Sequence, residues 1–207
     1  MIVETNTMTA TQLIKPLSVE TKEGLLFVGG CSVDALIKEH GSPLYVMDIQ
    51  SLNQNCQNYL EPLQQNLDKY QVIYASKANL SIAMAKQLIN QGLGFDVVSG
   101  GELNTVLRAG ANPKTIYFHG NNKSKEELIL AIKSGVQIVI DNDYEFELIS
   151  QLSQDLKTKV SFLLRLKPEI EAHTHEFIKT GQLDSKFGLQ KNDASHYILK
   201  SLNNSLK

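Results

Sequence analysis

Charged or titratable side chains stand at or near the ends of five apolar runs in this 207-residue sequence. They are Lys77 in YQVIYASK, Asp96 in GFDVVS, His119 in TIYFHG, Asp141 in VQIVID and Arg165 in KVSFLLRLKP. If the runs are neighbouring parallel strands, these groups converge on one polar mouth above an apolar scaffold. An amine in such a mouth could form an ion pair or capture a carbonyl group.

Lys77 has the weakest purely structural interpretation of the five. A lysine ammonium is costly to bury unless it is paired, modified or used. Burial or cationic neighbours lower the pKa of a lysine from about 10.4 and make it a nucleophile that can form a Schiff base. That chemistry suits an aldehyde cofactor such as pyridoxal phosphate, which accepts electrons from a carbanion. An ion pair remains the alternative.

The other four residues have both structural and functional interpretations. Asp141, next to Asn142, is expected to help cap the following helix rather than to take part in catalysis. Asp96 could be held by backbone amides, and His119 could be structural. Arg165 could simply pair with a neighbouring carboxylate.

Other patterns that could carry chemistry are weak. His173 and His175 have no third ligand at useful spacing, so we interpret them as solvated loop residues and expect no metal site. Cys31 and Cys56 form no CxxC pair. The glycines at 100–101 do not belong to a GxGxxG fingerprint.

The elements that would position these groups alternate along the chain. Before the alternation we expect a short strand at 24–30, a helix at 31–41 with Ser32 as its cap, a strand at 42–48 and a helix at 49–67 that is interrupted at Pro62. Strands then follow at 70–77, 94–99, 115–120, 136–141 and 159–168, separated by helices at 80–92, 101–110, 124–135 and 142–156, with a last helix at 192–204. Period-two alternation in the first of these strands places Ile73, Ala75 and Lys77 on one face. The alternation predicts an α/β fold, either a doubly wound sheet or a (β/α)8 barrel, and leaves these two open.

Composition excludes several function classes. The net charge of -2 gives no indication of a nucleic-acid or polybasic membrane surface. The first residues lack the apolar core of a secretory signal, and no stretch approaches the ~20 apolar residues of a membrane span. We therefore expect a soluble protein of the cytoplasm.

YASKAN, followed by GFDVVSGGEL, resembles the N-terminal part of the fold-III pyridoxal-phosphate decarboxylases, which include the ornithine, arginine and diaminopimelate decarboxylases. The stretches IYFHGNNKS, VQIVIDNDYEFELI, THEFIKTG and DSKFGL are most similar to the diaminopimelate decarboxylase group. The resemblance covers about residues 24–190.

The resemblance implies an alanine-racemase-like (β/α)8 barrel, of which this chain carries about five βα units. Residues 1–15 would be a leader, 16–48 a contribution to a mostly missing β-domain, and 49–207 the partial cofactor-binding barrel. It implies that Lys77 is the catalytic Schiff-base lysine and that Lys77, Asp96, His119 and Arg165 bind the cofactor.

The implied reaction converts meso-2,6-diaminopimelate to L-lysine in lysine biosynthesis, with a homodimer as the active form. The family's later phosphate-binding loop and substrate-binding residues are not found in this sequence, so we expect the chain alone to be unstable and inactive. A non-catalytic pyridoxal-phosphate carrier and an inert gene remnant are the alternatives.

Overall fold

The computed structural model describes residues 18–167 and 187–203 of the chain. The chain divides into two compact units, Met1–Tyr70 and Gln71–Lys207, and each is described by itself. The predicted loop histidines His173 and His175 lie outside the described residues, and so does the whole THEFIKTG stretch.

The described part of the first unit, residues 18–70, contains a small antiparallel sheet and two helices. Its strands are β1 (Val19–Lys22), β2 (Leu25–Val28) and β3 (Cys31–Ser32), paired in the order β1-β2-β3. They are followed by α2 (Val33–His40) and α3 (Ile49–Asn66). The predicted Ser32 cap is confirmed, since its hydroxyl accepts a hydrogen bond from Ala35 N.

Two predictions for the first unit are wrong. Residues 42–48 form no strand, because no described strand pairs with them, and several of their apolar side chains are exposed, such as that of Tyr45. Helix α3 is not interrupted at Pro62 but continues to Asn66. Asp48 caps the amino end of α3, and its carboxylate accepts a hydrogen bond from Gln50 N at 2.9 Å.

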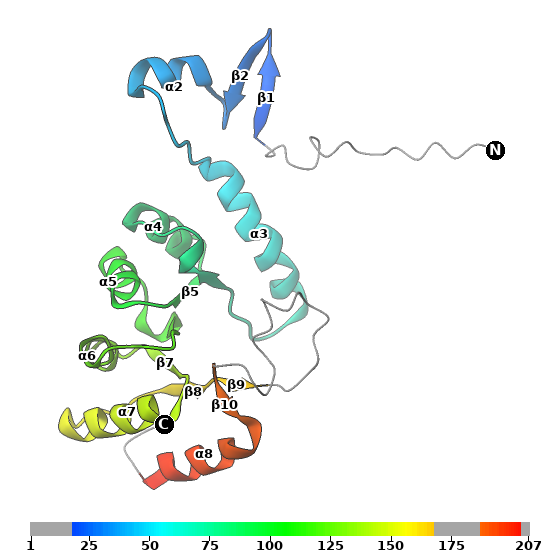
Figure 1. The fold of residues 1–207 in the computed structure, drawn as a ribbon. Helices are drawn as coiled ribbons and strands as arrows, with labels where there is room; N and C mark the ends of the chain where they lie inside the picture. Colours follow the sequence, from blue (N-terminus) through cyan, green and yellow to red (C-terminus); the bar gives the residue numbers. More distant parts are fainter. Residues whose placement is uncertain (1–17, 168–186, 204–207) are drawn as a thin grey trace. The chain divides into compact units, whose positions relative to one another are not determined.

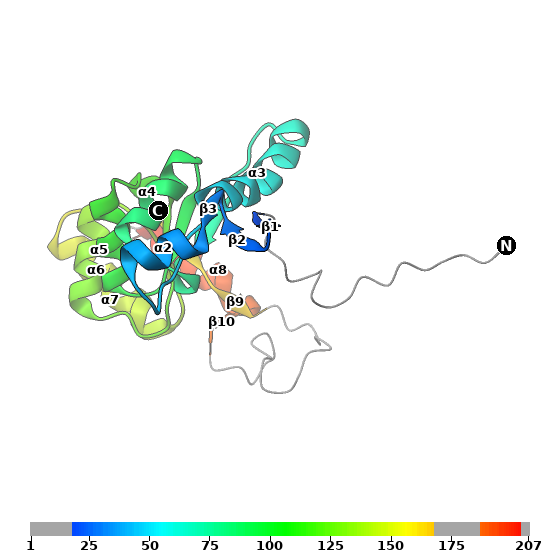
Figure 2. The same cartoon turned by 90° about the horizontal axis from the view of Figure 1, so that it is seen from above.

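The second unit is built on a five-stranded parallel sheet in sequential order. The strands are β4 (Ile73–Ala75), β5 (Gly94–Val97), β6 (Ile116–Phe118), β7 (Gln137–Ile140) and β8 (Phe162–Leu164). The helices between them are α4 (Ile82–Asn90), α5 (Gly100–Ala109), α6 (Lys125–Ser134) and α7 (Asp143–Asp155), which lie along one side of the sheet (Figures 1 and 2). The predicted alternation is confirmed, although every strand is shorter than the sequence suggests.

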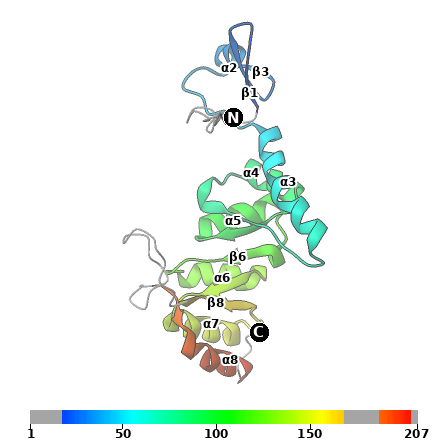
Figure 3. The same cartoon turned by 90° about the vertical axis from the view of Figure 1, so that its right-hand side faces the viewer.

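Short helices and strands complete the second unit. The 3-10 turns are η1 (Ser76–Ala78), η2 (Pro113–Thr115) and η4 (Lys191–Asp193). Strand β9 (Leu166–Lys167) pairs in parallel with β10 (Leu189–Gln190), and α8 (Ala194–Asn203) follows. Figure 3 shows α7 and α8 beside one another at one end of the unit. Tyr197 of α8 contacts Phe146 of α7 edge to face, with 5.1 Å between ring centroids.

The two faces of the five-stranded sheet differ sharply in burial. One face contributes the apolar core and is fully buried at Phe95, Val97, Ile116, Phe118, Ile138 and Ile140. The strand registers place Ala75 beside Asp96, Asp96 beside Tyr117, and Val139 beside Leu163 on the opposite face. That face is partly open, since Leu163 remains 43% exposed. Both faces of a parallel sheet are normally covered by other elements. The partly open face, which we call the inner face, is therefore where the unit can receive further groups.

Side-chain caps set where each of the helices α4 to α7 begins, after the carboxyl end of the preceding strand. Ser81, Ser99, Ser124 and Asn142 each accept a hydrogen bond from the backbone amide three residues on. Helices α4, α5 and α6 end close to glycines, and Gly110 and Gly135 adopt the left-handed conformation that favours this residue. These short connections bring all the strand ends to one edge of the sheet, which we call the carboxyl edge.

Candidate active site

The carboxyl edge gathers most of the residues that the sequence singled out. His119, Asp141 and Arg165 each come directly after a strand, and Asp96 is the third residue of β5. Alternation from the printed pairings puts all four on the inner face of the sheet. The predicted convergence of polar groups on one edge is therefore confirmed for these four residues.

Lys77 lies at the same edge but not on a strand. Strand β4 ends at Ala75, and Lys77 is the middle residue of the 3-10 turn η1. The prediction that period-two alternation fixes its direction is therefore wrong, because the strand backbone has already turned. Its side chain is exposed and makes no hydrogen bond or ion pair with the other residues that the structure describes. The amine is thus accessible, rather than buried in an ion pair.

His119 and Asp96 form a loose pair across β5 and β6. The distance from His119 Nε2 to Asp96 Oδ1 is 4.0 Å, which is beyond hydrogen-bond length. Burial lowers the pKa of His119, an effect that the Asp96 carboxylate opposes and that the cations Lys123 and Arg165 reinforce. Asp96 Oδ1 is itself buried and accepts no hydrogen bond from the part of the chain that the structure describes. An acceptor in that state is ready for a donor from a ligand.

Arg165 is held by Asp141. Its Nη1 donates to Asp141 Oδ1 at 2.8 Å, joining the ends of β8 and β7. The carboxylate is buried, whereas the guanidinium is about one third exposed. The sequence interpretation of Asp141 as a helix cap is replaced by this ion pair, and Asn142 supplies the cap alone. A guanidinium has five donors, so Arg165 keeps donors beyond those that Asp141 uses.

The sequence analysis did not predict the buried ion pair that Lys123 and Glu145 form near the carboxyl edge. Lys123 Nζ lies 2.9 Å from Glu145 Oε1, and both side chains are almost entirely enclosed. Burial lowers the pKa of Lys123 and raises that of Glu145, while each group offsets part of the other's shift. Lys123 stands in the polar turn HGNNKS, where composition indicates exposure, so no pattern could have shown its burial.

The third residue of each of the helices α5, α6 and α7 is a glutamate that accepts hydrogen bonds from backbone amides at the carboxyl edge. Glu102 accepts from Val98 N at 2.8 Å, Glu145 from Asp141 N at 2.9 Å, and Glu127 from both Ser124 N and Gly100 N. The spacing of a Ser or Asn cap followed three residues later by Glu is the capping-box signature, which could have identified all three. They hold backbone amides in place and leave the inner face clear.

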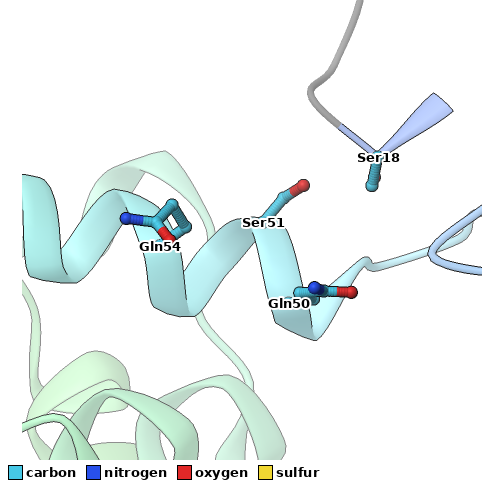
Figure 4. A pocket seen from close by; sticks show the side chains of 4 residues that line it. All are labelled: Ser18, Gln50, Ser51 and Gln54. Carbon is cyan, nitrogen blue, oxygen red and sulfur yellow. The ribbon is translucent and has the colours of Figure 1, made fainter.

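A separate hollow in the first unit contains none of the predicted residues. Ser18, Gln50, Ser51 and Gln54 line it, and Figure 4 shows Ser51 pointing from the first turns of α3 toward Ser18. The hydroxyls of Ser18 and Ser51 are the main cause of a lowered pKa at Asp48. The residues that line this hollow include no nucleophile or base comparable to those at the carboxyl edge.

Comparison with known proteins identifies the family to which this chain belongs. The model of the family described as "Pyridoxal-dependent decarboxylase, pyridoxal binding domain" matches residues 50–207, about three quarters of the chain. The chain belongs to this pyridoxal-dependent decarboxylase family. The match begins in α3 and includes every strand of the five-stranded sheet.

Curated relatives in the pyridoxal-dependent decarboxylase family are diaminopimelate decarboxylases. The chain is 47% identical over 191 residues to the enzyme of Synechocystis sp., covering 87% of this chain and 41% of that protein. It is 43% identical over 172 residues to that of Bacillus subtilis, covering 83% and 39%. The chain thus spans about two fifths of the length of the curated relatives it matches.

Solved structures of the pyridoxal-dependent decarboxylase family confirm the predicted fold. The diaminopimelate decarboxylase of M. jannaschii in co-complex with L-lysine matches with a TM-score of 0.80 and 32% identity, over 93% of this chain and 46% of that chain. The Helicobacter pylori enzyme complexed with L-lysine matches with a TM-score of 0.75 and 30% identity, over 84% and 44%. The five-stranded sheet is accordingly a partial alanine-racemase-like barrel.

The residues at the carboxyl edge fit pyridoxal phosphate, the cofactor of the pyridoxal-dependent decarboxylase family. The exposed amine of Lys77 suits an aldehyde, and Arg165 suits an anion. The buried Asp96 Oδ1 lacks a donor that a bound ligand could provide. Among the described residues no group of His, Cys, Asp and Glu could hold a metal ion, and no helix is long and apolar enough to cross a membrane.

Proposed function

We propose that the chain binds pyridoxal phosphate at the carboxyl edge through Lys77 and takes part in the decarboxylation of meso-2,6-diaminopimelate to L-lysine. The observation that carries the proposal is the juxtaposition on one sheet edge of an accessible lysine with Asp96, His119 and Arg165. When bound, pyridoxal phosphate supplies an electron sink for the carbanion that the loss of carbon dioxide leaves.

Each residue has a distinct task in this proposal. Lys77 would supply the amine for the cofactor's aldehyde, since its side chain is accessible at the carboxyl edge. Asp96 accepts a hydrogen bond through its unpartnered Oδ1. Burial lowers the pKa of His119, which favours the neutral imidazole at the carboxyl edge. Arg165, oriented by Asp141, attracts anionic groups.

The substrate assignment rests on the relatives. Curated proteins with 38–47% identity are named diaminopimelate decarboxylase. Three of the similar structures are described as complexes with L-lysine, the product of the proposed reaction. We extend this substrate class, a homodimeric assembly, a cytoplasmic location and the division into 1–15, 16–48 and 49–207 to the chain as proposals.

A non-catalytic carrier of pyridoxal phosphate is the second candidate. It needs only the accessible amine of Lys77 and the groups beside it, and no decarboxylation. Formation of L-lysine from meso-2,6-diaminopimelate with added cofactor would exclude the non-catalytic carrier. The sequence-based expectation that these 207 residues alone form no L-lysine stays a prediction, and turnover by the chain would contradict it while supporting the reaction.

Cofactor binding itself is tested by titrating the chain with pyridoxal phosphate and recording the visible absorbance of the bound form. We expect Lys77→Ala to lose this absorbance. Lys86→Ala is the matched control, since Lys86 is an exposed lysine of α4 in the same unit, and it should bind as the wild type does. Equal absorbance in Lys77→Ala and the wild type would refute the proposed attachment.

A further inference from the structure

Lys123 and Glu145 form an ion pair that no bulk solvent reaches. Their side chains are 1% and 3% exposed, and Nζ lies 2.9 Å from Oε1. Neither side chain can therefore touch a ligand bound on the inner face. Their contacts are instead with the backbone at the carboxyl edge.

Lys123 joins the ends of two adjacent strands. Its Nζ donates to Gly120 O at 2.7 Å, one residue beyond His119, and to Val139 O in β7 at 2.9 Å. With Glu145 as third acceptor, all three ammonium donors are used. The position of the His119 backbone relative to β7 is thus set by a side chain behind it.

Glu145 connects Lys123 to Arg165 through Asp141. Its Oε2 accepts from Asp141 N at 2.9 Å, and Asp141 in turn binds Arg165 Nη1 at 2.8 Å. Arg165 N also donates to Ile140 O at 2.9 Å. One continuous set of bonds therefore runs from the end of β6 through β7 to the end of β8.

Stability alone is a poor explanation for such a pair. Removing two charges from water costs about as much as their attraction returns, and apolar residues of similar volume are often equally stabilising. What apolar residues cannot supply is the directed bonding to Gly120 O, Val139 O and Asp141 N. The bonds end on the backbone of residues that flank the candidate site.

We propose that Lys123 and Glu145 are positioning residues that fix His119 and Arg165 at the carboxyl edge, an inference that rests on the proposed cofactor site. The pair acts through backbone and never on the ligand. Its role is to hold the ends of β6, β7 and β8 in register while the inner face stays open.

Native-state hydrogen exchange on the cofactor-free chain tests this, because it resolves local from global loosening. The key variant is Lys123→Met with Glu145→Leu, which removes both charges and keeps an apolar filling. The reporters are the amides of His119, bonded to Val97 O, and Arg165, bonded to Ile140 O. Reference amides at the opposite ends of strands are Gly94, bonded to Val72 O, and Ile138, bonded to Ser161 O.

We expect the two reporter amides to exchange more than about tenfold faster in the variant, with the reference amides changing less than about threefold. Glu147→Gln on α7 and Lys125→Met on α6 are matched controls, because both residues are exposed, and they should leave all four amides unchanged. Equal acceleration at all four amides, or none at His119 and Arg165, would overturn the proposal.

A second variant covers the case in which the double variant does not fold. Glu145→Gln keeps the volume but cannot accept from both Lys123 Nζ and Asp141 N, so it should loosen the same two reporters. If neither variant folds, the pair supports the whole unit and the positioning role is refuted. Because no cofactor is present, failure here is distinct from failure of Lys77 to bind pyridoxal phosphate.

Discussion

Arg165 and Asp141 connect the last two strands of the sheet at their carboxyl ends, with Nη1 and Oδ1 2.8 Å apart. Asp141 is 3% exposed, so loss of its partner leaves a carboxylate that water cannot solvate. We predict that Arg165→Met lowers the free energy of unfolding by about 2 kcal/mol. Arg165→Lys should lose less, since it keeps the charge but not the fork of donors. Urea unfolding measures both, and a loss in Arg165→Met no larger than in Arg165→Lys would contradict the prediction.

Titration of His119 should reveal its partly buried position. Because burial is the main cause of its shift, its pKa in the folded chain should lie below the ordinary value of 6.5. Asp96→Asn should lower this pKa further, since the Asp96 carboxylate opposes the shift. Proton NMR of the imidazole ring measures both values. A pKa for His119 that rises in Asp96→Asn would show that the carboxylate acts in some other way.

The lowered pKa of His119 also makes the free energy of unfolding depend on pH. Its folded pKa is lowered, so as pH falls below about 6.5 the unfolded chain takes up a proton that the folded chain does not. The contribution of His119 to the free energy of unfolding is therefore fully present above about pH 6.5, and it is lost as the pH falls toward the pKa of the folded chain. We expect the decline in unfolding free energy between pH 7 and 5 to be shallower in His119→Gln. Identical pH profiles for the two proteins would refute this linkage.

Gly100 owes its identity to the close approach of Glu127. A Cβ at position 100 would lie 2.7 Å from Glu127 Cγ, so Gly100→Ala must displace the glutamate and its bond to the Gly100 amide. We predict a loss of about 1–2 kcal/mol in unfolding free energy. Gly101→Ala is the matched control, because its added Cβ would meet only Ser99 Oγ at 3.8 Å. In a Glu127→Ala background the cost of Gly100→Ala should largely vanish, and a cost that persists there would point to another cause.

The sequence predicted the alternation of strands and helices and the Ser32 cap of α2, since these depend on local patterns. Apolar runs gave β5, β6 and β7 within a few residues, and Ser32 stood where the cap of α2 belongs. It also brought Asp96, His119 and Arg165 to one edge, because parallel strands align their carboxyl ends.

Features that depend on distant partners could not be predicted from the sequence. Residues 42–48 look strand-like but have no described strand beside them. The burial of Lys123 depends on Glu145, which is 22 positions further along the chain. Lys77 leaves the sheet in a 3-10 turn that neither its apolar run nor its alternation indicates. For residues 42–48 and for Lys123 the deciding contact, or its absence, is tertiary.

The central claim is that the Lys77 amine bonds covalently to pyridoxal phosphate. Borohydride reduction of the loaded chain makes that bond permanent, and mass spectrometry of the digested protein then identifies the modified peptide. We predict one pyridoxyl group, located on Lys77 and absent from the Lys77→Ala variant. A label on another lysine such as Lys69 or Lys86, or an unmodified Lys77 in a chain that has demonstrably bound the cofactor, would contradict the account.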